Sequence, residues 1–114
     1  MTDETALHLR SLDPGLAPYA VYLINAARAA QVPLVAISGR RSAAANREVG
    51  GAERSLHLYG HAFDVQVLGY RVDQIPLWWW LELGRFWEAM GGRWGGRFSP
   101  PDLNHFDAGL GVDV

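Results

Sequence analysis

The chain has 114 residues, enough for one domain with a hydrophobic core but not for two. With 49% apolar and 19% charged residues, it has the composition of a globular chain and not of a disordered one. A net charge of −2 provides no basic field for nucleic acid, and the lack of cysteine excludes disulfides and thiolate metal ligands.

A helix is predicted over residues 13–31. The Asp-Pro pair at its start can cap the first turn. Apolar residues then recur at spacings of three and four, and the helix stops before Pro33. Residues 33–37 follow as a short buried strand, which runs into a loop at residues 38–42.

The second half of the chain predicts short elements around one long helix. A short helix is expected over residues 43–49, closed by the two glycines at 50–51. Apolar and polar residues alternate over 62–67, which predicts a half-buried strand. A second long helix, rich in Trp and Leu, is predicted over 74–90, and the Gly- and Pro-rich tail, residues 93–114, is expected to form turns and short strands.

The order of these elements favours an α+β fold with a small antiparallel sheet packed against helices. No repeat or linker divides the sequence, so we expect a single domain over residues 1–114. The chain starts with acidic and polar residues, which indicates no signal peptide, and no apolar run is long enough to predict a membrane span.

Two segments carry side chains that could hold a metal ion. Residues 55–64 supply His57 and Asp64, and the tail supplies His105, with Asp102 three residues before it. Two imidazoles and a carboxylate can bind zinc and leave one position open for water.

His57 and Asp64 can meet at one metal only if the chain turns between them. Seven residues of strand would cover about 23 Å and place the two side chains on opposite faces, and on a helix they would stand about 10 Å apart. Gly60 lies where such a turn is needed. We therefore predict one ligand on an incoming strand or loop, a turn, and a second ligand early in the strand. The alternative is a loop histidine and an ordinary carboxylate on a strand.

The other polar residues near these ligands have more than one interpretation. Asp102 could act as a general base beside the metal, or cap a turn after two prolines. Asp107 could orient His105 or face solvent, and His61 could be a fourth ligand, a substrate contact or a bystander.

Arginines and tryptophans are further candidates. Arg40 and Arg41 follow a predicted buried strand, where Arg41 could hold a substrate carboxylate or stabilise an oxyanion; the alternative is two solvated loop arginines. Consecutive tryptophans at 78–80 point about 100° apart on a helix and cannot form one flat platform. We expect Trp80 in the core and Trp94 in the wall of a cleft.

The pattern Ser-x-His-x-x-Gly-x-Ala-x-Asp at residues 55–64 resembles the core motif of the M15 zinc peptidases. This family contains D-alanyl-D-alanine carboxypeptidases and dipeptidases and phage L-alanyl-D-glutamate endopeptidases, and it is related in fold to Hedgehog domains. Residues 38–42 are similar to the family's Ser-Gly-Tyr-Arg-Ser loop, with Arg40 in place of tyrosine. The resemblance covers residues 35–107 and implies a Hedgehog/DD-peptidase-like fold.

The resemblance also implies a role for each candidate residue. His57, Asp64 and His105 would be the ligands of Zn²⁺, Asp102 would stand where the family places its catalytic Glu or Asp, and Arg41 would stand at its substrate or transition-state arginine. The expected substrate is the peptide stem of bacterial peptidoglycan.

Other short patterns help to distinguish between the activities found in the family. Trp-Gly-Gly at 94–96 and His-Phe-Asp at 105–107 resemble the endolysin branch, which favours an L-alanyl-D-glutamate endopeptidase. Such an enzyme would act at the cell wall as a monomer, after release by a holin-type partner. Residues 46–55 are similar to the Asn-x-x-Val-Gly-Gly-Ala-x-x-Ser stretch of some members, so a D-alanyl-D-alanine carboxypeptidase is the alternative.

A third hypothesis comes from another class of protein. A non-catalytic zinc-binding structural module, such as a phage-particle component, would need the same ligands. The intact Asp102 argues against it, because a structural site gains nothing obvious from a spare carboxylate.

Overall fold

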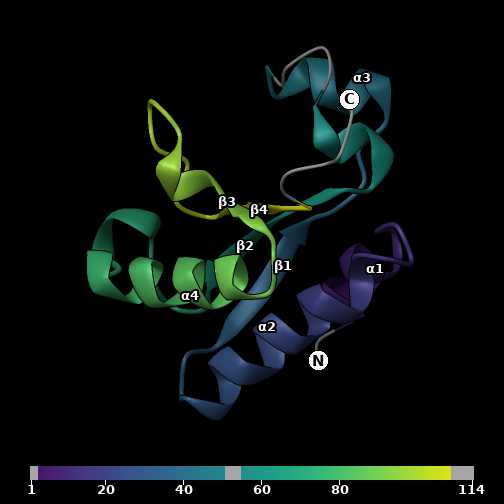
Figure 1. Ribbon diagram of the computed structural model, residues 1–114. Helices are drawn as coiled ribbons and strands as arrows, with labels where there is room; N and C mark the ends of the chain where they lie inside the picture. The colour runs from purple at the N-terminus through teal and green to yellow at the C-terminus, as the bar shows by residue number, and fades with distance from the viewer. Residues whose placement is uncertain (1–2, 51–54, 109–114) are drawn as a thin grey trace.

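The computed structural model describes residues 3–50 and 55–108 (Figure 1). Its helices are α1 (Asp3–Arg10), α2 (Ala17–Ala29), α3 (Ala43–Glu48) and α4 (Leu77–Ala89), with short 3-10 helices η1 (Leu56–Tyr59), η2 (Val72–Gln74) and η3 (Gly95–Arg97). Its strands are β1 (Leu34–Ser38), β2 (Ala62–Val67), β3 (Arg93–Trp94) and β4 (His105–Asp107). These strands form one antiparallel sheet in the order β1-β2-β4-β3, which confirms the predicted α+β class.

The two faces of the sheet differ in chemistry. Phe63 and Phe106 are fully buried at 0% exposure, and both pack edge-on against Trp87 of α4. Asp64 and His105 are the chain neighbours of these two phenylalanines, so they point to the opposite face. The apolar face therefore builds the core with α2 and α4, and the polar face is left for a site.

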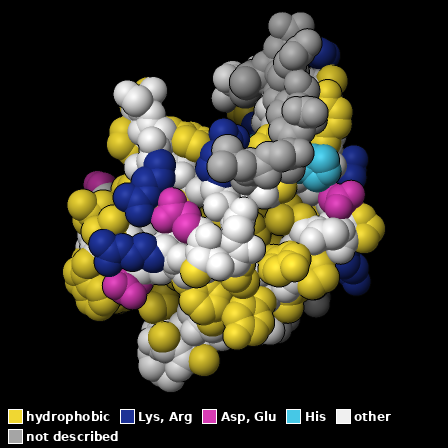
Figure 2. All heavy atoms as spheres, in the orientation of Figure 1, with side chains coloured by type: hydrophobic (Ala, Val, Ile, Leu, Met, Phe, Trp, Pro, Cys, Tyr) yellow, Lys and Arg dark blue, Asp and Glu magenta, His cyan; other side chains and the backbone are white. Residues whose placement is uncertain are grey.

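The surface over the helices is also rich in apolar groups. Figure 2 shows apolar side chains gathered over the lower part of the molecule, where α2 and α4 lie in Figure 1. Tyr22 and Trp78 are both more than half exposed, at 61% and 63%. No helix within the described ranges is both long and apolar enough to cross a lipid bilayer.

The start of the chain differs from the prediction. The helix predicted over 13–31 is observed as α2, and residues 13–16 form a turn before it, in which Asp13 Oδ2 accepts from the Gly15 amide at 2.9 Å. α1 was not predicted, because only Thr5 and Leu9 of its described side chains are buried. Such a short polar helix carries no clear amphipathic signal.

Four further elements were predicted, one with the observed bounds and three with shifts of one to three residues at one or both ends. They are β1, α3, β2 and α4, and the tail does form short strands. Gly50 has a φ of 68°, as expected of a glycine that ends a helix. Gly51 and residues 109–114 lie outside the described residues.

The tryptophans are mainly core residues. Trp80 is fully buried, as predicted. Trp94 was expected in a cleft wall, but this was wrong, because it is 1% exposed and its Nε1 donates to the Leu103 carbonyl at 2.8 Å. A Cβ at Gly84 of α4 would collide with the Trp94 indole, so the missing side chain of Gly84 makes room for the ring.

Candidate metal centre

Asp64 and His105 are brought together by strand pairing. They are register partners on β2 and β4, so their side chains leave the same face of the sheet side by side. His105 Nδ1 lies 3.4 Å from Asp64 Oδ1. On its other side Asp64 pairs with Ser38 of β1, which follows an irregularity in the register of β1 and β2.

His57 reaches the same place from η1. The Ser55 hydroxyl caps this 3-10 turn by accepting from the His57 amide at 3.2 Å. Gly60 ends it with a φ of 72°, in the left-handed region that glycine favours, and the chain reverses into β2. The predicted turn is confirmed, with the difference that His57 stands on a 3-10 helix and not on a strand or loop.

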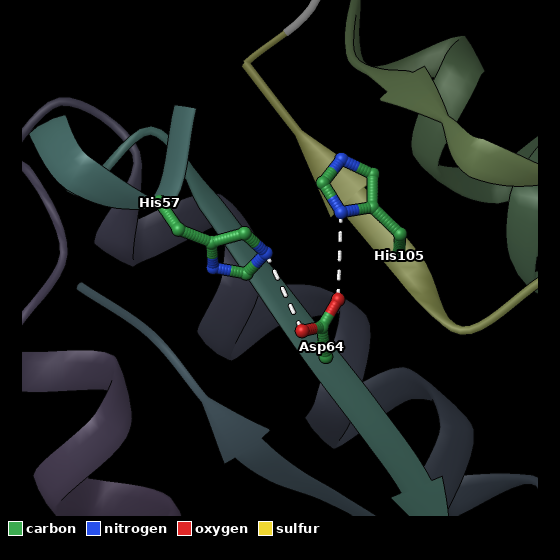
Figure 3. Close-up of side chains that lie close together, drawn as sticks. All are labelled: His57, Asp64 and His105. Carbon is green, nitrogen blue, oxygen red and sulfur yellow. Dashed lines mark ion pairs between the residues drawn. The ribbon is translucent and has the colours of Figure 1, made fainter. Parts of the chain in front are cut away.

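The three side chains converge on one point, as Figure 3 shows. Their ligating atoms all lie within 4.8 Å of one another, and His57 Nε2 is 3.3 Å from Asp64 Oδ2. Two donor atoms bound to one tetrahedral zinc ion stand roughly 3.4 Å apart, since each lies about 2.1 Å from the ion. Each imidazole lies at about this distance from one of the two Asp64 oxygens, so the three side chains are close enough to share one ion.

The hydrogen bonds of His57 leave one nitrogen ready to bind a metal. Its Nδ1 lies 2.9 Å from the carbonyl oxygen of Gly39, which can only accept, so Nδ1 carries the proton. Its Nε2 is buried without a hydrogen-bond partner in the described part of the chain, so it is the nitrogen that can offer its lone pair to a metal when it carries no proton. A buried, unpaired acceptor beside a carboxylate fits a metal cation.

His105 is oriented the opposite way. Its Nε2 lies 2.8 Å from Asp107 Oδ2, and its Nδ1 faces Asp64. Asp107 is completely buried and is itself held by Arg93, with Nη2 2.8 Å from Oδ2. Of the two interpretations of Asp107, orientation of His105 is therefore the one that matches its position.

Charge at the centre favours a cation. Burial alone would raise the pKa of Asp64, but the His105 and His57 imidazoles outweigh it and hold that pKa well below its usual range. Burial would lower the pKa of His105, but contacts with Asp107 and Asp64 raise it to about 9. Without metal, a proton on His105 balances the carboxylates, and a bound zinc ion would replace it.

Arg41 lies at the edge of the centre. Its Nη2 is 3.4 Å from Asp64 Oδ2, and its Nη1 donates to Asn46 Oδ1 at 3.0 Å. Its amide donates to the His57 carbonyl at 2.8 Å. Arg41 is thus held next to the Asp64 carboxylate and is not a freely solvated loop residue.

Arg40 and His61 lie away from the three ligating groups. The Arg40 Nε donates to the Ser11 carbonyl at 3.1 Å, which ties the 38–42 loop to the end of α1. His61 Nε2 is 4.0 Å from Asp13 Oδ1, and its ring is near that of Tyr59. His61 does not belong to the group of residues that could share one metal.

Asp102 lies in the turn that leads into β4. Its carbonyl accepts from the His105 amide at 3.2 Å, and its amide donates to the Gly95 carbonyl at 2.8 Å. A Cβ at Gly95 would collide with the Asp102 carbonyl, so glycine is required for this approach. The Asp102 side chain is exposed, and its role as a general base stays a prediction.

Three contacts of the centre were not singled out from the sequence. They are the Gly39 carbonyl on His57, Asn46 on Arg41, and Arg93 on Asp107. A backbone carbonyl carries no sequence signal. Arg93 could have been found only by pairing residue 93 with residue 107 across β3 and β4.

Comparison with known proteins supplies independent findings. The protein-family model described as Peptidase M15 matches residues 5–80. The crystal structure of the L-Ala D-Glu endopeptidase ChiX from Serratia marcescens is 30% identical, with a TM-score of 0.65, covering 94% of this chain and 87% of that one. No curated protein matches the sequence.

A second solved structure shares the fold at lower identity. It is the D,D-pentapeptidase VanY from a VanB-type vancomycin-resistance cassette, in complex with Zn(II). It is 18% identical, with a TM-score of 0.65, and the match covers 87% of this chain and 74% of that one.

Proposed function

Since this chain belongs to the M15 family of peptidases, we propose that it cleaves the peptide stems of bacterial peptidoglycan as an L-alanyl-D-glutamate endopeptidase. The observation that carries the choice of bond is the 30% identity, over nearly the whole chain, to a protein described as an L-Ala D-Glu endopeptidase. The likeness to the D,D-pentapeptidase, at 18% identity, supports the fold alone.

We assign the zinc ligands as His57 Nε2, Asp64 and His105 Nδ1. Their spacing, and the unpartnered lone pair of His57, support this assignment. Zinc in this position would supply a Lewis acid and lower the pKa of a water molecule to about 7.

The remaining chemistry falls to two side chains. Asp102 takes a proton from the attacking water and passes it to the leaving amine. Its exposed place in the turn before His105 leaves its carboxylate open to solvent and substrate. Arg41 stabilises the negative charge that develops on the carbonyl oxygen, and its contacts with Asn46 and Asp64 hold the guanidinium for this purpose.

The products of peptidoglycan digestion test the choice of bond. Mass analysis of purified cell walls treated with the protein should show a new D-glutamate amino terminus, and a chelator should abolish it. Free D-alanine in its place would identify a D,D-carboxypeptidase, which the resemblance of residues 46–55 favours, although residues 51–54 of that stretch lie outside the described ones. Intact walls in the presence of fully bound zinc would identify a non-catalytic module.

A further inference from the structure

A row of polar side chains crosses the sheet from its edge to the metal centre. Arg93 and Asp107 are register partners on β3 and β4, and Asp107 and His105 are two residues apart on β4. All three side chains therefore leave the same face of the sheet. The Arg93 fork donates to both Asp107 oxygens, with Nε at 3.1 Å from each and Nη2 at 2.8 Å from Oδ2, and the same Oδ2 lies 2.8 Å from His105 Nε2.

Burial of Asp107 restricts the movement of this row of side chains. Asp107 is 0% exposed, and a carboxylate removed from water is tolerated only when its charge and its lone pairs are matched. The planar guanidinium of Arg93 does both, because two parallel N–H donors fix the plane of the carboxylate. Arg93 also lies 4.9 Å from the centre of the Phe98 ring, and that ring packs at 5.4 Å against His105.

The orientation of His105 depends on this contact. In Figure 3, one ring nitrogen of His105 faces Asp64 and the other points away. An imidazole could flip and offer either nitrogen, and only a fixed acceptor on one side selects the ligating one. Asp107 is that acceptor, and Arg93 donates hydrogen bonds to both of its carboxylate oxygens.

We propose that Arg93 is a positioning residue for the metal centre: through Asp107 it locks His105 with Nδ1 toward the metal and so strengthens the retention of zinc. This inference rests on the ligand role of His105 in the proposed function. Arg93 acts through another residue, so its effect is on metal binding before it is on the chemistry.

The chain offers a matched control in Arg97. Its side chain is about as exposed as that of Arg93, at 52% against 47%. It also binds a carboxylate with two nitrogens, that of Glu88 at 3.0 and 3.1 Å, and it also lies over an aromatic ring, that of Trp94. Its two hydrogen bonds go to Glu88 and not to the row, so Arg97→Met removes the same kind of interaction at a different place.

The test compares zinc affinity by competition with a chromophoric chelator in the whole protein. Arg93→Met should raise the zinc Kd about 10- to 100-fold, the range for lost partners of metal ligands, whereas Arg97→Met should stay within about twofold of the wild type. The zinc Kd of Arg93→Lys should lie between those of the other two variants, because an ammonium group keeps the charge but cannot donate two parallel hydrogen bonds to the carboxylate. An Arg93→Met protein that binds zinc as tightly as Arg97→Met overturns the proposal.

A spectroscopic readout separates positioning from simple stability. In the zinc-loaded wild type, nitrogen NMR of His105 should show the proton on Nε2 in slow exchange with water, and Arg93→Lys should speed that exchange while Arg97→Met leaves it unchanged. Equal exchange in all three proteins contradicts positioning. Zinc affinity that depends on Arg93 in a protein that leaves peptidoglycan intact would refute the proposed function and leave this inference standing.

Discussion

At the scale of single residues, the centre is defined by which nitrogen each histidine presents. His57 donates a hydrogen bond from Nδ1 to the Gly39 carbonyl and turns Nε2 toward Asp64, whereas His105 points Nε2 at Asp107 and turns Nδ1 toward Asp64. The sequence predicted both histidines as ligands but not these orientations, because they depend on a backbone carbonyl and on an acid that is fixed only when the strands pair.

Substitution of Asp102 separates metal binding from catalysis. Asp102→Ala should bind one zinc ion per chain with wild-type affinity and lose nearly all hydrolysis, since a general base contributes 10²- to 10⁴-fold to rate. Zinc content and peptide cleavage measured on the same sample check this. His57→Ala is the contrasting variant, which should lose tight zinc binding, and normal turnover by Asp102→Ala would remove Asp102 from this role.

The pH dependence of zinc affinity follows from His105. Its pKa is raised to about 9 without metal, so below that pH zinc must displace a proton from it. Apparent affinity should therefore rise with pH, by at most about tenfold per unit, and level off above pH 9. Chelator-buffered titrations between about pH 7 and 10 measure this, and an affinity that is flat from pH 7 to 9 would contradict it.

At the scale of elements, local sequence patterns predicted single helices and strands but not how the strands pair. The alternation over 62–67 and the glycine at 60 were enough to place β2 and the turn before it. The three-residue strand β4 carries no pattern of its own, and its register with β2 is a contact between distant parts of the chain. That register is what brings Asp64 to His105, so the sequence could name the candidate ligands but could not show that they meet.

Packing between α4 and β3 gives a prediction at this scale. In an exposed helix interior, Gly→Ala stabilises by about 1 kcal/mol. At Gly84 the new methyl group would overlap the Trp94 indole, and overpacking of this kind costs about 1–3 kcal/mol, so Gly84→Ala should lower the free energy of unfolding. Urea unfolding measures the sign, with exposed Arg85→Ala as the α4 control, and a more stable Gly84→Ala protein would show that Trp94 moves aside.

At the scale of the whole molecule, one sheet serves two purposes. Its apolar face packs on α2 and α4 around Trp87, and its polar face carries Arg93, Asp107, His105 and Asp64 in a row. Packing of the core on the apolar face thus fixes the positions of the strands that carry the site on the other face. A single monomeric domain over residues 1–114 and action after holin-type release remain predictions.

Zinc should stabilise the whole fold by mass action. Ligands from η1, β2 and β4 are held together by one ion only in the folded state, so zinc at about 100 times its Kd should add about 2.7 kcal/mol to the free energy of unfolding. Thermal unfolding with zinc and with a chelator measures this, and His57→Ala should respond much less. An unfolding midpoint that does not depend on zinc would show that the metal does not join these elements.

Zinc-edge anomalous diffraction from crystals of the zinc-loaded protein tests the central claim most directly. We predict a single zinc peak about 2.0–2.2 Å from His57 Nε2, an Asp64 oxygen and His105 Nδ1, with a fourth position open to solvent. A peak that lies elsewhere, or that omits any one of these three side chains, would contradict the account.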